Sequence, residues 1–196
     1  MKVLKINSSA AKSTSLSRCQ VDSIVSELLI KYPNAEVIER DVAYSNLPFP
    51  DDKFIDAIFQ GGELNEEQQK VTHLSDQLVD ELVGSDILVI GAPMYNFTIP
   101  ASLKAYFDLI ARAGKTFHYN EHGYPLGLVE NKKAIVVITT GGIPLGSPMD
   151  FSKQYITTFL GFLGIQEIEF VELDENRFKY EEKVKKAKEK LVSLFS

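Results

Sequence analysis

The 196-residue sequence contains no tryptophan, one cysteine, three histidines and no long hydrophobic run. A lone Cys19 excludes an internal disulfide framework, is typical of a reducing compartment, and is expected to pack within a helix. The most apolar stretch, residues 87–90, is far shorter than a membrane span of roughly 20 residues. Near the start, Lys5 interrupts the apolar residues, so no secretory signal is expected. We therefore expect a soluble, cytoplasmic protein that has no membrane partner.

The charge balance and the few histidines exclude further classes of function. The chain has 21 Lys and Arg against 27 Asp and Glu, a net charge of −6, which argues against nucleic-acid binding. His118 and His122 would form a metal pair only on a helix, but Gly123 and Pro125 indicate a turn or hairpin, so we expect no metal. No Ser-His-Asp or kinase pattern is present. This favours chemistry carried by a bound cofactor.

Apolar runs and helical periodicity alternate along the chain. Short apolar runs predict five strands, and spacings of three and four residues predict five helices. The strands are expected at 2–7, 36–41, 86–91, 133–138 and 166–171, and the helices near 17–31, 65–82, 100–113, 150–163 and 177–194. Residues 42–63 are expected to form a loop or an irregular segment.

This alternation predicts an α/β fold with a five-stranded parallel sheet and helices on both faces. A three-layer, flavodoxin-like or Rossmann-like strand order is favoured, in one domain spanning residues 1–196. Ligands of such sheets bind beyond the carboxyl ends of the strands. The loops after the first, third and fourth strands are therefore the candidate sites.

The first loop, Ser8 to Ser17, is rich in hydroxyls and leads into a helix N-terminus, which suits an anion such as phosphate. A simple helix cap in a polar loop has the same composition. The second loop, Gly91 to Pro100, places Met94, Tyr95 and Phe97 around Asn96, which suits a flat ring such as a flavin. Packing against the rest of the chain is its alternative explanation.

The third loop, Thr139 to Gly146, contains the pair Gly141 and Gly142. Glycine lets the backbone approach a ligand closely or adopt a positive φ, although a plain turn has the same composition. Its position at the same sheet edge as the other two loops is the more informative feature.

The sequence resembles the FMN-dependent NADH-azoreductases, flavodoxin-like enzymes that also reduce quinones. The resemblance rests on motifs spread over nearly the whole chain. They are Ala92-Pro-Met-Tyr-Asn-Phe97, Leu103-Lys-x-Tyr-Phe-Asp108, Ala111-Arg-Ala-Gly114, Thr116-Phe117, Gly141-Gly142 and Thr158-Phe-Leu-Gly-Phe162.

The resemblance implies an FMN cofactor, with the first loop holding its phosphate. The second loop would contact the isoalloxazine and ribityl, and the third would flank the polar edge of the ring. The matching positions are Ser9, Ser15, Leu16 and Ser17, then Met94, Tyr95, Asn96 and Phe97, then Thr139, Thr140, Gly141 and Gly142. It also implies a homodimer in which Tyr119 and Phe162 line a substrate pocket completed by the second subunit.

Two positions depart from the family pattern. Thr140 stands where many relatives have arginine, and Pro144 where some have histidine.

The expected activity is a two-electron, ping-pong reduction of quinones and azo compounds by NADH, with no catalytic side chain because FMN carries the chemistry. A flavodoxin-type electron carrier and a flavin-free interaction module are the alternatives.

Overall fold

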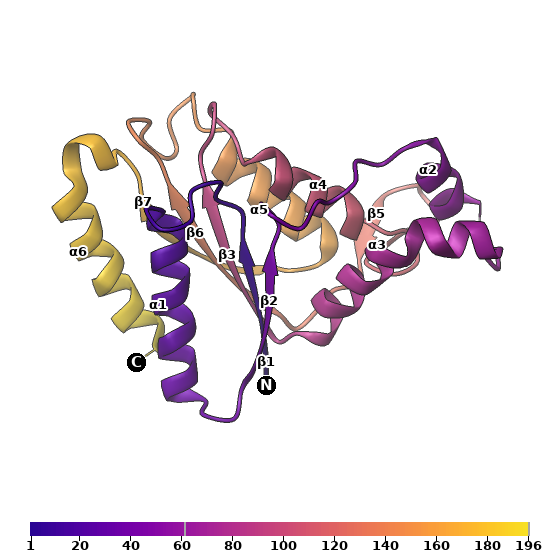
Figure 1. Ribbon diagram of the computed structural model, residues 1–196, viewed down its shortest axis with the longest axis horizontal. Coiled ribbons are helices and arrows are strands. Elements are labelled where there is room, and N and C mark those ends of the chain that lie inside the picture. Colours follow the sequence, from indigo (N-terminus) through magenta and orange to yellow (C-terminus); the bar gives the residue numbers. More distant parts are fainter. Residues whose placement is uncertain (61, 196) are drawn as a thin grey trace.

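A five-stranded parallel sheet forms the centre of the protein (Figure 1). The computed structural model describes residues 1–60 and 62–195. The strands follow the spatial order β2-β1-β3-β6-β7, which is the 2-1-3-4-5 order of flavodoxin-like folds. Their bounds are β1 (Lys2–Asn7), β2 (Glu36–Asp41), β3 (Ile87–Pro93), β6 (Lys133–Thr139) and β7 (Glu167–Leu173). The predicted fold class is confirmed.

Helices cover both faces of this sheet, so the molecule has three layers (Figure 1). One face carries α1 (Leu16–Lys31) and α6 (Asn176–Phe195), and the other carries α3 (Glu66–Gly84), α4 (Ala101–Ile110) and α5 (Ser152–Leu163). Strand β3 is apolar throughout, and β6 is apolar between Lys133 and Thr139; both are almost wholly buried, because helices pack on each side of them. Among the described residues, no helix combines the length and the apolar character needed to cross a bilayer.

The expectation of an irregular segment at 42–63 is wrong over part of its length, where α2 (Asp52–Phe59) forms. Asp51 caps this helix by accepting a hydrogen bond from the Phe54 amide at 2.9 Å. Phe54 and Ala57 are buried, and the helix packs against α3. Phe54, Ala57 and Ile58 lie at helical spacing, so the apolar face of this short helix is visible in the sequence as well as in the packing.

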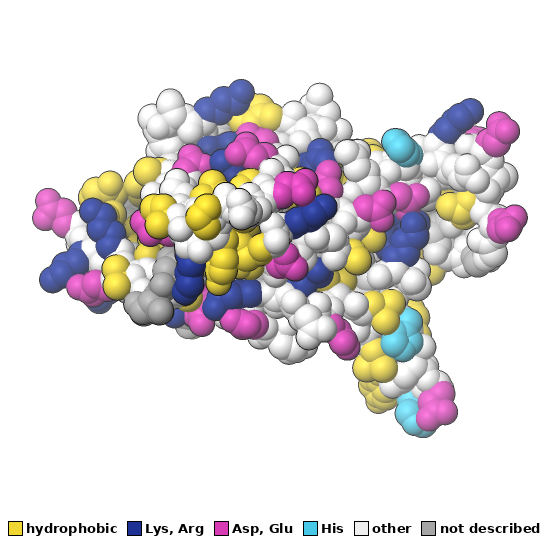
Figure 2. Space-filling model, turned by 90° about the horizontal axis from the view of Figure 1, so that it is seen from below, with side chains coloured by type: hydrophobic (Ala, Val, Ile, Leu, Met, Phe, Trp, Pro, Cys, Tyr) yellow, Lys and Arg dark blue, Asp and Glu magenta, His cyan; other side chains and the backbone are white. Residues whose placement is uncertain are grey.

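The segment that contains His118 and His122 folds into a hairpin, as expected. Strands β4 (Phe117–Tyr119) and β5 (Pro125–Gly127) pair antiparallel. Figure 2 shows a narrow projection with histidine and hydrophobic side chains at its surface, in keeping with this hairpin. Tyr119 and Tyr124 are 56% and 68% exposed, so the hairpin presents aromatic side chains outward.

Candidate functional site

The three candidate loops meet at the carboxyl ends of β1, β3 and β6. Strand β2 lies on one side of β1, and the later strands β3, β6 and β7 follow on the other side. The order of the strands therefore switches direction between β1 and β3, which is the point where flavodoxin-like sheets bind ligands. Hydrogen bonds join the loops in series. The Ser8 hydroxyl donates to the Gly91 carbonyl at 2.6 Å, and the Met94 amide donates to the Thr139 carbonyl at 2.8 Å. The structure therefore brings the predicted loops into one site.

The Tyr95 hydroxyl connects the first loop directly to the second. It lies 3.2 Å from the Ser9 hydroxyl and accepts a hydrogen bond from the Ala10 amide at 3.1 Å. Ser9 in turn accepts from the Ala11 amide, so its hydroxyl is part of a small network. Ser9 and Tyr95, 86 positions apart in the sequence, are thus neighbours.

The first loop ends at the N-terminus of α1. Ser15 caps this helix by accepting from the Arg18 amide at 3.3 Å, and its hydroxyl lies 3.1 Å from that of Ser17. The amides of Leu16 and Ser17 have no acceptor in the described part of the chain. Free amides at the positive end of a helix dipole form an anion site. The predicted residues Ser15, Leu16 and Ser17 therefore offer donors suited to a phosphate group.

Arg18 holds this loop in place. Its guanidinium forms two hydrogen bonds with the Asp41 carboxylate, at 2.7 and 2.8 Å, and donates to the Ser9 carbonyl at 2.7 Å. Hydrogen bonding to Asp41 raises the pKa of Arg18 despite some burial. The loop is thus shaped before any ligand binds.

The second loop contains a tight and strained turn. The Tyr95 amide donates to the Thr98 carbonyl at 2.8 Å, and the Thr98 amide donates back at 3.2 Å. Between them, Asn96 has φ 50° and Phe97 has φ 74°. A left-handed conformation costs an L-residue about 1–2 kcal/mol, although asparagine tolerates it better than phenylalanine. Such strain persists where the surroundings impose it, often at a ligand site.

The turn leaves two donors and two aromatic side chains open to solvent. The amides of Asn96 and Phe97 have no acceptor among the described residues. Tyr95 and Phe97 are 38% and 45% exposed, and Met94 is half-buried. Tyr95, Asn96 and Tyr155 also line an open cavity of about 520 Å³. Burial raises the pKa of Tyr155 to about 12, so its hydroxyl stays protonated at neutral pH.

The third loop is held by the chain segment that follows β7. The Thr140 hydroxyl donates to the Ile143 carbonyl at 2.6 Å and accepts from the Glu175 amide at 3.0 Å. The Thr140 carbonyl accepts from the Asn176 side chain at 3.1 Å. Because these bonds occupy the polar groups of Thr140, we expect it to shape the loop and not to bond a ligand. The exposed amides of Gly141 and Gly142, in contrast, have no acceptor within the described residues.

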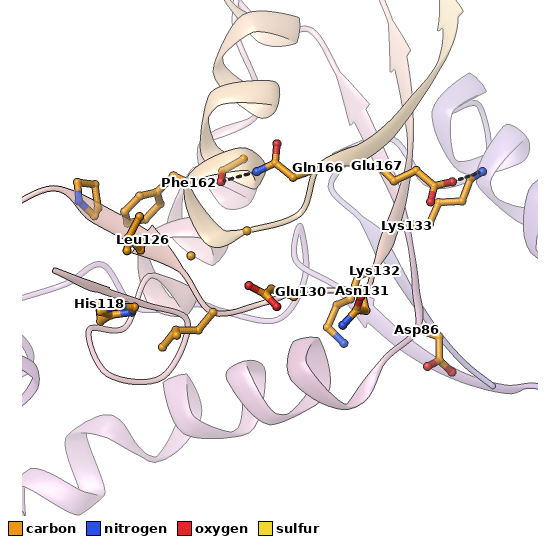
Figure 3. Close-up of a pocket in the computed structure, with 15 residues that line it drawn as sticks. Asp86, His118, Leu126, Glu130, Asn131, Lys132, Lys133, Phe162, Gln166 and Glu167 are labelled. Atoms are coloured by element: carbon orange, nitrogen blue, oxygen red, sulfur yellow. Dashed lines mark hydrogen bonds and ion pairs between the residues drawn. The ribbon is translucent and has the colours of Figure 1, made fainter. Parts of the chain in front are cut away.

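The predicted pocket residues Tyr119 and Phe162 lie elsewhere. Phe117 connects them: its ring centroid is 4.6 Å from that of Phe162 and 5.5 Å from that of Tyr119. Phe162 lines an open depression of about 1020 Å³ whose other walls include Asp86 and Lys133 (Figure 3).

Asp86 precedes β3 and Lys133 begins β6, so this depression lies at the end of the sheet opposite the three loops. Within this chain, the structure therefore does not bring Tyr119 and Phe162 to the candidate site.

Comparison with known proteins decides the family. A model of a family described as having a flavodoxin-like fold matches residues 1–194. An FMN-dependent NADH:quinone oxidoreductase from Hahella chejuensis is 45% identical over 174 residues, which are 88% of this chain and 84% of the relative. One from Vibrio vulnificus is 48% identical over 152 residues, 78% and 77% of the two chains. The chain belongs to this oxidoreductase family.

A solved structure supports the same fold for the oxidoreductase. The crystal structure of an azoreductase from Bacillus anthracis strain Sterne matches with a TM-score of 0.86 at 27% identity. The match covers 98% of this chain and 95% of that one. The resemblance inferred from the motifs is therefore confirmed.

Some residues at the oxidoreductase site were not expected from the sequence. Arg177 and Phe178 lie against Gly141 and Gly142, at the start of α6. No motif marks them, although they follow the carboxyl end of the fifth strand and the loop-after-strand rule applies there too. The expectation that Cys19 packs within its helix is wrong, because it lies on the exposed side of α1.

Asp174 fixes the third loop to α6. It is 4% exposed, accepts from the Leu145 amide at 3.0 Å and forms an ion pair with Lys183. Burial alone would raise the pKa of Asp174, but the hydrogen bonds from Lys183 and the Leu145 amide together outweigh it and hold that pKa below its usual range. A carboxyl whose pKa is lowered by folding stabilises the fold at pH values above its unfolded pKa of about 3.9.

Asp174→Asn therefore lowers the free energy of unfolding at pH 7 by about 2 kcal/mol, the size of a hydrogen bond to a charged group. As the pH falls below about 4, the wild type loses this contribution and the difference shrinks. Urea denaturation at pH 7 and at pH 3 measures both values. The control is Glu181→Gln, which removes an exposed carboxylate from the same helix. A difference that stays constant with pH contradicts the assignment.

Proposed function

We propose that this chain is an FMN-dependent oxidoreductase that uses NADH to reduce quinones and azo compounds. The observation that carries the proposal is the meeting of three loops with unpaired donors at the β1–β3 reversal point. The relatives from Hahella and Vibrio are named FMN-dependent NADH:quinone oxidoreductases, and the Bacillus anthracis structure is an azoreductase. We propose further that one flavodoxin-like domain, residues 1–196, carries the whole activity.

The chemistry of the donor set fits FMN. A phosphate needs amide and hydroxyl donors near positive potential, which the start of α1 supplies through Ser15 and Ser17. A flavin ring needs donors at its polar edge, and the exposed amides of Gly141 and Gly142 provide them. It also needs an apolar surface on one side, which Phe97 offers. The phosphate donors, the donors for the polar edge of the ring and the apolar surface each occur in the loop where the corresponding part of FMN is expected.

When bound, FMN would supply the two-electron redox chemistry that links NADH to the acceptor. The chain itself has three tasks. The α1 N-terminus and its serines hold the phosphate, and the strained Tyr95–Thr98 turn positions the ring. The open cavity beside Tyr95 and Tyr155 keeps space for NADH and the acceptor in turn. Solvent delivers the protons, so no acidic side chain is needed at the ring.

We propose that the active form is a homodimer. Tyr119 and Phe162 lie at the far end of the sheet from the candidate site, and the hairpin exposes Tyr119, Tyr124 and Leu126. Exposed aromatic groups of this kind favour an interface. In the dimer, Tyr119 and Phe162 would line the pocket of the partner subunit. Sedimentation equilibrium that returns the mass of a single 21.9 kDa chain at micromolar concentration rejects this arrangement.

The decisive experiment is reconstitution with FMN followed by steady-state assay. We expect a visible flavin absorbance band after excess FMN has been removed, and NADH oxidation that requires both FMN and a benzoquinone. An electron carrier would retain flavin without oxidising NADH at an appreciable rate. A flavin-free interaction module would show no band.

A cytoplasmic location is also proposed, because an NADH donor and an unpaired cysteine fit a reducing compartment.

A further inference from the structure

Arg177 has no anionic partner in the described part of the chain. The sequence has four arginines, and the other three form ion pairs: Arg18 with Asp41, Arg40 with Glu81, and Arg112 with Asp76. No carboxylate lies within 4.0 Å of the Arg177 guanidinium among the described residues. This arginine is exposed, and it lies at the edge of the sheet where the three loops meet.

The carboxylates nearest to Arg177 in the sequence are already neutralised. Asp174 pairs with Lys183, and Glu175 pairs with Lys179 at 2.9 Å. Among the described residues, no carboxylate of this segment forms an ion pair with Arg177. A guanidinium without a carboxylate partner beside a candidate ligand site supplies a positive potential that attracts an anionic group.

Both the backbone and the side chain of Arg177 are held against the third loop. Its amide donates to the Gly141 carbonyl at 2.9 Å. A Cβ atom placed on Gly141 would lie only 3.4 Å from Arg177 Nε and 3.8 Å from Cδ, so the arginine lies directly over the glycine. The kink of α6 at Lys179, where φ is −130°, separates this turn from the rest of the helix. The Arg177 side chain therefore lies against Gly141, and Phe178 lies against Gly142.

We propose that Arg177 contacts the polar edge of the bound flavin ring and stabilises its negatively charged, two-electron-reduced form. The inference rests on the proposed function, since it assumes that FMN binds between these loops. A guanidinium presents several donors in one plane, which matches the carbonyl and nitrogen atoms of that edge.

The test is the affinity of Arg177→Gln for oxidised and reduced FMN, together with the midpoint potential of the bound flavin. We expect affinity for the reduced form to fall about tenfold more than affinity for the oxidised form. For a two-electron couple, that ratio corresponds to a potential about 30 mV more negative. Arg177→Lys, which keeps the charge but loses the planar fork, should give a smaller shift.

The matched control is Lys185→Gln, which removes one exposed positive charge from the same helix, two turns further on. We expect it to leave the potential unchanged. If Arg177→Gln binds FMN with the wild-type potential, the proposal is wrong. A change confined to the KM for NADH would also overturn it, because the guanidinium would then serve the nucleotide. Failure of the wild type itself to bind FMN would instead reject the proposed function.

Discussion

Ser15→Asp is expected to weaken FMN binding roughly 100-fold while leaving the protein as stable as the wild type. Aspartate caps a helix as well as serine does and interacts favourably with the positive end of the helix, so α1 should be preserved. Its carboxylate would, however, lie where the phosphate is expected. Two like charges about 4 Å apart near a protein surface repel by up to about 4 kcal/mol, enough for a loss of this size. Fluorescence quenching during FMN titration measures the affinity, and thermal denaturation measures the stability.

Two controls separate charge repulsion from a change of shape. Ser15→Asn keeps the cap without the charge and should bind FMN within a fewfold of the wild type. Riboflavin lacks the phosphate, so its affinity should be nearly the same for the wild type and Ser15→Asp. If Ser15→Asp weakens riboflavin as strongly as FMN, the phosphate does not lie at the start of α1.

Gly127→Ala is expected to destabilise the protein severely and to impair quinone reduction. A Cβ atom at Gly127 would overlap backbone atoms of Leu163 and Gly164, at the C-terminal end of α5. Backbone atoms cannot rotate aside as a side chain does, so β5 must move. We expect a loss of roughly 3 kcal/mol in the free energy of unfolding, which lowers the melting temperature by about 6–12 °C for a chain of this size.

The effects of this substitution on binding and on turnover should differ. The hairpin lies at the end of the sheet opposite the three loops, so FMN affinity measured below the melting temperature should change little. The quinone KM should rise, because the displaced hairpin would no longer complete the pocket of the partner. Gly123→Ala is the matched control: this glycine has φ 78° at the tip of the same hairpin, with no atom within 4 Å of its Cβ position. It should cost only about 1 kcal/mol. Equal stability of the two variants would contradict the packing against α5.

Much of the fold could be predicted because its signals are local. The strands at 2–7 and 133–138 are short, largely apolar segments bounded by polar residues, and they occur within one residue of their expected positions. β3 instead extends to Pro93, because Pro93 pairs with Thr139 across the sheet. That extension depends on contacts between distant segments, which a local pattern does not report, whereas α2 carries a local apolar pattern within its eight residues.

The candidate site could be predicted as loops but not as contacts. The rule for parallel sheets identified the three loops, and the structure joins them through Ser8, Tyr95 and Met94. Nothing in the residue type of Phe97 indicates a left-handed backbone, since phenylalanine rarely adopts one. The approach of Arg177 to Gly141 depends on the kink in α6 and on the path of the short connection between β7 and α6. Neither feature follows from composition.

The strained turn at Asn96 and Phe97 also affects how preparations of the protein are judged. The chain without ligand already adopts that backbone conformation, so a ligand can bind the loop without reshaping it. Any ligand that binds only the folded form then raises stability by mass action. Ligand present at 100 times its dissociation constant adds about 2.7 kcal/mol. For a chain of this length that is about 5–11 °C in melting temperature. Thermal stability should therefore report the fraction of molecules loaded with cofactor, and a biphasic melting curve would indicate a mixed preparation.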